Sequence, residues 1–401
     1  MRKILVTFIL LFLAGAGTAQ AFDADDIEIH GFASTGYLKT DHNNYLLLSE
    51  DGSFEFNEAG LNVTTFLNDN LRAGMQVFSR DQGDVGNNDI KLDWAFLDYQ
   101  WKEMLGLRVG RIKTPIGLYN ETRDYDMLRT SILLPQGLYN TYYREAMMAY
   151  QGAGLYGNLP LAAGGRFGYD LYAGTMEVKS DGIMAKYMSD TELITSSARI
   201  DRIFGGRLRW YTPLQGLTLG SSLIQLEMDM EFEGALAPMT MDWSTSNMRF
   251  FYLSADYDLG NWTLAAEYHR WKFDYTVFLD MSLLELPSPP PLDDTTDSES
   301  YYVLLSYRLT DWFEVGTYYN VFYNDRDDRD GKTWEQDTGS SDYSAWRKDL
   351  AVSARFDMTD SWLVKLEVHL MDGAAIVDYS DNPDGFEKEW MLFAVKTTFN
   401  F

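Results

Sequence analysis

The chain has 401 residues, of which 46% are hydrophobic and 15% are aromatic, and it contains no cysteine. Acidic residues outnumber basic ones 60 to 33, which gives a net charge of −27 and excludes a basic nucleic-acid-binding protein. The missing cysteines exclude a disulfide scaffold and a cysteine-ligated metal site, and the 26 Tyr, 23 Phe and 11 Trp exclude a disordered chain.

The first 21 residues have the pattern of a secretion signal. Arg2-Lys3 precedes a short apolar run over residues 4–14, and Ala19-Gln20-Ala21 supplies the small residues of a cleavage site. The alternative is an N-terminal membrane helix, which is disfavoured because crossing a bilayer takes about 20 apolar residues. We therefore expect residues 1–21 to be a signal peptide and residues 22–401 to be the mature chain.

The mature chain alternates apolar and polar residues with period two, the pattern of β-strands whose two faces differ. For example, Leu366 and Val368 alternate with Lys365 and Glu367. The only amphipathic helix expected is a short one inside residues 120–148. Sixteen strands are expected, at residues 27–38, 53–66, 71–80, 89–101, 105–111, 150–157, 165–173, 199–211, 217–228, 247–258, 262–273, 300–309, 312–322, 345–357, 362–370 and 389–401.

The connections between these strands alternate between short and long along the chain. Seven are tight turns, and eight are longer, at residues 39–52, 81–88, 112–149, 174–198, 229–246, 274–299, 323–344 and 371–388. An even number of strands with all long loops at one end is typical of bacterial outer-membrane barrels. The sequence thus predicts an all-β fold, a transmembrane antiparallel β-barrel with short periplasmic turns and long outer loops.

Aromatic residues mark the expected membrane boundary. Five of the 11 Trp lie within two residues of a short turn, where an indole ring favours the level of the lipid headgroups: Trp101, Trp210, Trp262, Trp312 and Trp362. The alternative is that aromatic residues often flank hairpins. The last strand ends in Phe401, and a terminal Phe on such a strand resembles the assembly signal of outer-membrane barrels.

A sheet in hydrocarbon must close on itself, because each unpaired backbone group costs several kcal/mol there. Charged residues must then face inward, since a charge on the lipid face costs about 2–4 kcal/mol at mid-depth. Sixteen strands make a barrel too wide for side chains to fill, so the sequence predicts a water-filled channel. The expected partners are membrane lipid and lipopolysaccharide, and no cofactor is expected.

The inward positions are mildly basic although the chain is acidic. The segments 226–242, 289–299, 325–342 and 378–389 hold 21 acidic and 4 basic residues. Rings of charge set ion preference in pores, so a basic wall favours anions while an acidic mouth favours cations. The acidic segments are interpreted as a solvated outer face, with binding of divalent cations as the alternative. The basic residues expected to line the pore are Arg72, Arg80, Arg108, Arg166, Arg207, Arg209, Arg355 and Lys365.

The longest connection, residues 112–149, differs in composition from the acidic segments. Its apolar residues, such as Ile132 and Leu138, indicate that it packs against another part of the protein. We expect it to fold into the barrel and narrow the channel. The charged candidates at this constriction are Glu121, Arg123, Asp124, Asp126 and Arg129.

Residues 110–118 read Gly-Arg-Ile-Lys-Thr-Pro-Ile-Gly-Leu, and Arg144-Glu145 and a glycine-rich strand follow. This pattern resembles the porin family that includes the phosphate-selective outer-membrane porins. The resemblance implies a trimer of sixteen-stranded barrels in the outer membrane of a Gram-negative bacterium, with the third outer loop as the constriction. Phosphate selectivity does not carry over, because those channels cluster basic residues where this loop mixes both charges.

The main hypothesis is a passive channel for small hydrophilic solutes. The alternative is a porin specific for one solute class, such as phosphate, a carboxylate or a sugar. An enzyme is not expected, because the Ser/His or Asp/His cluster of a barrel protease or lipase is not found. An adhesin or structural barrel is the third hypothesis, favoured if the lumen is plugged.

Overall fold

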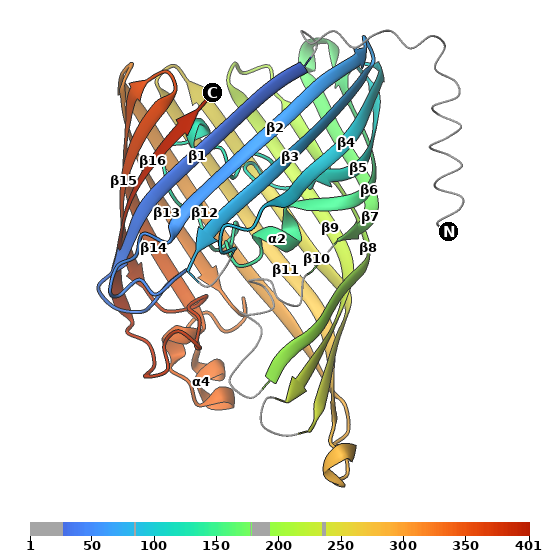
Figure 1. Ribbon diagram of the computed structural model, residues 1–401, viewed down its shortest axis with the longest axis vertical. Helices are drawn as coiled ribbons and strands as arrows, with labels where there is room; N and C mark the ends of the chain where they lie inside the picture. Colours follow the sequence, from blue (N-terminus) through green and yellow to red (C-terminus); the bar gives the residue numbers. More distant parts are fainter. Residues whose placement is uncertain (1–26, 84–85, 177, 179–192, 235–237) are drawn as a thin grey trace.

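The computed structural model describes residues 27–401 except 84–85, 177, 179–192 and 235–237, so the expected signal peptide lies outside the described residues. The strands form one closed antiparallel barrel in which sequence neighbours pair and β1 pairs with β16 (Figure 1). The strands are β1 Ile27–Thr40, β2 Phe56–Asn68, β3 Leu71–Gln82, β4 Lys91–Lys102, β5 Leu105–Lys113, β6 Ala149–Pro160, β7 Arg166–Met176, β8 Leu193–Tyr211, β9 Leu217–Gly234, β10 Thr240–Leu259, β11 Trp262–Asp280, β12 Leu292–Thr310, β13 Phe313–Tyr323, β14 Trp346–Thr359, β15 Trp362–Asp372 and β16 Glu389–Asn400.

Helical segments are short. No helix in the described ranges is long and apolar enough to cross a membrane. The segments that the structure describes are η2 Asp126–Leu128, α2 Arg144–Met147, η3 Ala162–Gly164, η4 Ser282–Leu284, α4 Lys332–Thr338 and η5 Asp342–Ser344.

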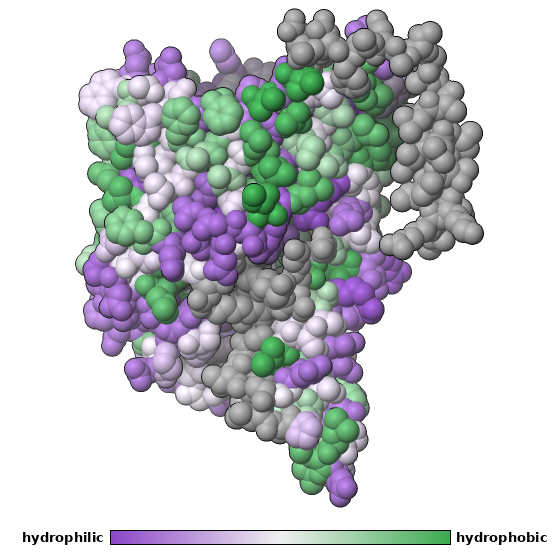
Figure 2. Space-filling model, viewed as in Figure 1, coloured by the Kyte–Doolittle hydropathy of each residue, from purple (hydrophilic) through white to green (hydrophobic). Residues whose placement is uncertain are grey.

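The period-two pattern decides which side chains face the membrane. In β15, Leu366 and Val368 are exposed on the outside, whereas Lys365 and Glu367 are buried inside. Figure 2 shows apolar side chains gathered over the half of the barrel nearer the short turns. The expected fold, a closed transmembrane barrel with an apolar exterior and a charged interior, is confirmed.

The end of the barrel with the short turns carries an exposed aromatic rim. The side chains of Trp101, Trp262, Trp312 and Trp362 are 43–56% exposed there, as expected for rings at the headgroup level. The chain end closes the seam of the barrel, because the backbone groups of Phe401 and Gly31 exchange hydrogen bonds of 3.0 and 3.1 Å.

The expected outer ends of β8–β12 are wrong. These five strands have 18–20 residues and the other strands have 9–14, so much of the expected loops 229–246 and 274–299 is paired strand. The outer half of β9 shows the reason. Met228 and Met230 are buried inside, while Glu227 and Asp229 are exposed outside and pair with arginines of β8. Charges on the outer face place this extension beyond the hydrocarbon.

Candidate functional site inside the barrel

The connection from β5 to β6 lies inside the barrel (Figure 1). The backbone N–H of Leu118 donates to Glu267 of β11 at 2.9 Å. Farther along the loop, the N–H groups of Ile132 and Leu133 donate to the Glu367 carboxylate of β15 at 2.7 and 2.8 Å. Because a buried N–H must find an acceptor, these wall carboxylates hold the loop in place across the lumen.

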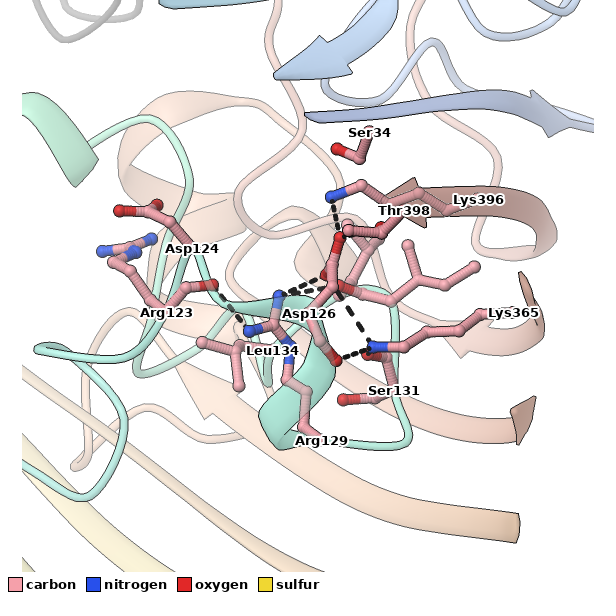
Figure 3. A network of polar contacts seen from close by, with 12 residues as sticks. Ser34, Arg123, Asp124, Asp126, Arg129, Ser131, Leu134, Lys365, Lys396 and Thr398 are labelled. Carbon is pink, nitrogen blue, oxygen red and sulfur yellow. Dashed lines mark hydrogen bonds and ion pairs between the residues drawn. The ribbon is translucent and has the colours of Figure 1, made fainter. Parts of the chain in front are cut away.

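Asp126 is the centre of one contact between the loop and the wall (Figure 3). Its carboxylate is fully buried and accepts hydrogen bonds from Lys396 Nζ and Thr398 Oγ1 of β16, both at 2.8 Å. Lys365 Nζ of β15 donates to the backbone carbonyl of Asp126 at 2.7 Å. Burial raises the pKa of Asp126, but the charges of Lys396 and Lys365 outweigh burial and hold that pKa well below its usual range.

A second contact joins the loop to β4. Arg144 donates two hydrogen bonds to Asp124, at 2.8 and 2.6 Å, and lies 3.3 Å from Asp93 of β4. Burial raises the pKa of Asp124, but the charge of Arg144 outweighs it and keeps the carboxyl ionised. Arg123 donates to the carbonyl of Tyr139 at 3.0 Å, and burial lowers its pKa to about 10.

These contacts correct part of the predicted site. Six side chains that we expected to meet water in the channel are at most 9% exposed: Arg80, Arg123, Asp124, Asp126, Arg207 and Lys365. Arg129 and Arg355 are also largely covered, because they donate to loop carbonyls of Arg123 and Met127 at 2.7 and 2.6 Å. Alternation places such residues on the inner face but does not show where the loop covers that face. Arg355 and Lys365 hold the loop against the wall, whereas Arg123, Asp124 and Arg129 form hydrogen bonds within the loop.

Arg72 and Arg108 keep access to the lumen on the short-turn side of the loop. Both side chains bond the Asp98 carboxylate, at 2.8 and 3.0 Å, and they are 36% and 23% exposed. Asp98 also accepts a hydrogen bond from the Tyr156 hydroxyl at 2.6 Å. Two guanidinium groups thus share one carboxylate and leave a positive charge on this wall.

The basic wall continues on β7 and β8. Arg207 and Arg209 lie 3.0 and 3.4 Å from Asp170, and Arg207 is also 2.6 Å from Glu121 of the loop. Arg209 is 36% exposed, and the exposed Arg166 lies over the Tyr211 ring at 4.3 Å. Five of the predicted arginines therefore line one wall with three carboxylates. Their role in conduction stays a prediction.

The wall on the other side of the lumen has a different balance of charge. Arg308 of β12 is 2.6 Å from Glu314 and 2.8 Å from Asp357, and Arg355 is also 2.8 Å from Asp357, so these two arginines balance the two carboxylates. Asp256 and Asp258 add acid on β10. The lumen is thus basic along β3–β8 and more acidic along β10–β14, which produces an electric field across the passage.

Some residues that build the site were not predicted. Glu267 and Glu367 lie on the inner face by alternation, but their role depends on the path of a loop distant in sequence. Arg144 lies near the end of the loop, and only its nearness in the sequence to acidic residues signals a buried ion pair. In the described part of the chain, no three His, Asp or Glu side chains converge on a metal site.

The chain matches no protein-family model, and no curated protein matches its sequence. Solved structures nevertheless share its fold. OmpF of Salmonella typhi, in complex with daunomycin, has a TM-score of 0.59 at 13% identity and covers 95% of this chain and 99% of its own. An anion-selective porin from Comamonas acidovorans has a TM-score of 0.57 at 15% identity and covers 94% and 99%.

A third similar structure is the outer membrane channel DcaP of Acinetobacter baumannii, with a TM-score of 0.54 at 10% identity and coverage of 96% and 100%. These likenesses extend over nearly the whole of each chain. At such low identities they show the fold alone. The chain has the fold of the outer-membrane porins, a closed barrel of sixteen antiparallel strands.

Proposed function

We propose that the protein is a porin, a passive water-filled channel for small hydrophilic solutes in the outer membrane of a Gram-negative bacterium. The observation that carries this proposal is the arginine wall, where Arg72, Arg108 and Arg209 remain partly exposed inside a barrel with an apolar exterior. Charged groups kept wet inside a membrane barrel mark a path for ions and polar solutes. The proposal involves no catalytic step. The Trp rim beside the short turns supports membrane lipid as a partner, and we expect lipopolysaccharide around the end with the long connections.

The charges on the two walls favour a channel that selects solutes by their charge distribution as well as by their size. A solute passing the loop moves between the basic wall of β3–β8 and the more acidic wall of β10–β14. A dipolar solute is stabilised when it orients in this field. An apolar solute is disfavoured, because it displaces water from the charged walls without replacing the interactions of that water. A channel specific for one solute class is the alternative, and it differs by showing saturation.

The test is the conductance of the purified protein in a planar lipid bilayer, with different salt concentrations on the two sides. We expect discrete single-channel steps, and the sign of the reversal potential gives the ion preference. The loop bonds to β11 on one side of the lumen and to β4 nearly opposite, and this observation favours the structural or adhesive barrel as a second candidate. A barrel that inserts but carries no current would establish that candidate and refute the channel.

We also propose that the barrel assembles as a homotrimer. A groove of about 1640 Å³ interrupts the wall at β2–β6, and it is lined both by outward apolar residues such as Met75 and Val109 and by charged residues such as Asp89 and Lys91. Charged groups facing lipid are costly, and a second copy covering this flank removes the cost. The trimer form reported for Vibrio cholerae OmpT shows that the fold supports such an assembly.

A further inference from the structure

A cavity of about 590 Å³ lies on the long-connection side of the loop, between that loop and the inner wall of β10–β13. The connection that carries α4 lines it from the other side. Its volume is within the range of small-molecule sites. A solute entering from the long-connection side meets this cavity before the arginine wall.

One side of the cavity is a continuous series of aromatic rings on β10 and β11. The Phe250 ring is stacked on Trp271, with 5.1 Å between centroids and 16° between planes. Trp271 is 5.2 Å from Phe273, and at the other end Tyr252 is stacked on His269 at 4.4 Å. These rings lie at alternate positions of paired strands, and therefore share the inner face.

A backbone irregularity keeps the series on one face. The pairing of β10 with β11 shifts between Ser246 and Arg249, and Asn247 has a φ of 57°. Trp243 before the shift and Phe250 after it both contact the aromatic residues of β11, although the interval of seven residues would otherwise place them on opposite faces. The bulge extends the aromatic series toward the outer end of the barrel.

The cavity also presents buried polar atoms without partners. His269 is 6% exposed and lines the cavity, and its Nε2 has no hydrogen bond among the described residues. The same holds for Trp271 Nε1, and for Trp334 Nε1 of α4 on the far side. An indole N–H can only donate, so each Trp requires an acceptor oxygen from a ligand or from water.

The charged residues around the cavity are mostly acidic. Asp294, Asp325 and Asp337 line it, whereas the carboxylate of Asp297 pairs with Arg270 and Lys272 on the outer face. The basic residue Arg123 also lines it, but the carbonyls of Tyr139 and Asn140 already accept from its guanidinium group, at 3.0 and 3.3 Å. An anion would meet carboxylates here, whereas an organic cation would offer no acceptor to the Trp271 N–H.

We propose that this cavity binds a neutral carbohydrate, which deepens the proposed channel function and rests on it for the passage of the solute. A sugar ring has an apolar C–H face for the aromatic series. Its hydroxyl groups accept from the Trp N–H groups and donate to the aspartates. A neutral sugar therefore matches the apolar rings, the hydrogen-bond donors and the hydrogen-bond acceptors of the cavity at the same time. The solute then continues past the loop to the arginine wall.

The test measures ion current through the intact protein in a planar bilayer while maltotriose, spermidine or citrate is added on the long-connection side. Maltotriose should reduce the current with saturation, and the other two should not saturate. Tryptophan fluorescence of the detergent-solubilised protein should titrate with maltotriose over the same range, which reports binding without any channel. Loss of a stacking ring and a donor in Trp271→Ala should weaken maltotriose binding about tenfold.

Trp271→Phe keeps the ring and removes only the N–H, so it should lie between wild type and Trp271→Ala in affinity. Trp101→Ala is the control, because Trp101 lies in the exposed rim beside a short turn, and it should bind maltotriose like wild type. The change in mobility of the band on an SDS gel after heating checks that each variant forms a folded barrel.

A current that does not respond to maltotriose overturns the carbohydrate site and leaves the channel intact. If spermidine or citrate reduces the current with saturation and maltotriose does not, the carbohydrate site is also overturned. If no current is seen but the tryptophan fluorescence still titrates with maltotriose, only the channel is refuted.

Discussion

Arg72 and Arg108 share the single carboxylate of Asp98, and the wall beside the loop is therefore positive. Arg108→Glu replaces this arrangement by two carboxylates and one guanidinium group. A change of two charges some 8 Å from a passing ion in water lowers the energy of a cation and raises that of an anion by about 1 kcal/mol each, which together is about thirtyfold in their permeability ratio. We expect Arg108→Glu to increase cation permeability over anion permeability by about that factor, and Arg72→Glu to act in the same direction. The reversal potential in a salt gradient measures it.

Arg199→Glu is the matched control for this reversal of charge. Arg199 is 64% exposed on the outer face of β8 and pairs with Asp229 outside the lumen. The reversal potential of this variant should equal that of wild type. An unchanged potential in Arg108→Glu would mean that ions do not pass along β3–β8.

At the scale of elements, the loop between β5 and β6 is held by carboxylates of the wall. Glu367 accepts two loop N–H groups and the Ser353 hydroxyl at 2.7 Å, and it is 1% exposed. Glu367→Gln conserves size but replaces one acceptor oxygen by a donor that faces N–H groups. A buried group left unsatisfied costs about 1–3 kcal/mol, so the loop should leave its position more often. We expect larger, noisier single-channel current and unfolding at a lower temperature.

The control for the loop is Asp69→Asn, which removes a carboxylate from the exposed short turn between β2 and β3. Its current and unfolding temperature should match those of wild type. If Glu367→Gln conducts as quietly as wild type, Glu367 does not control the position of the loop.

A comparison of the predicted strands with the observed ones shows how much of the fold can be predicted from the sequence. The predicted starts of β3, β9, β11 and β15, at residues 71, 217, 262 and 362, are correct, because a tight turn is a strong local signal. The outer ends of β8–β12 were missed, because strands with a charged outer face have the composition of solvated loops. The path of the loop was not predictable either. It depends on acceptors such as Glu367, more than 200 residues away from Ile132.

For the molecule as a whole, charge is separated along the barrel axis. The acidic outer strands and connections lie at one end, and the arginine wall lies toward the short turns. A solute thus meets an acidic mouth, then the aromatic cavity, then a basic wall. Neither cations nor anions are favoured along the entire path, and a neutral polar solute avoids both penalties. The net charge of −27 by itself does not describe this channel.

The groove at β2–β6 predicts which flank of the barrel meets its copies. Met75 lines this groove and is 43% exposed, whereas Val352 is 55% exposed on β14, five strands away from β3 around the barrel and outside the groove. Met75→Arg should convert trimers to monomers, because the charge lies between subunits. Val352→Arg should leave the trimer assembled and destabilise the barrel by about 2–4 kcal/mol, because the charge faces lipid. Native mass spectrometry gives the assembly, and thermal unfolding in lipid gives the stability. If Val352→Arg dissociates the trimer and Met75→Arg does not, the subunits meet at the flank that contains β14 and the groove faces lipid.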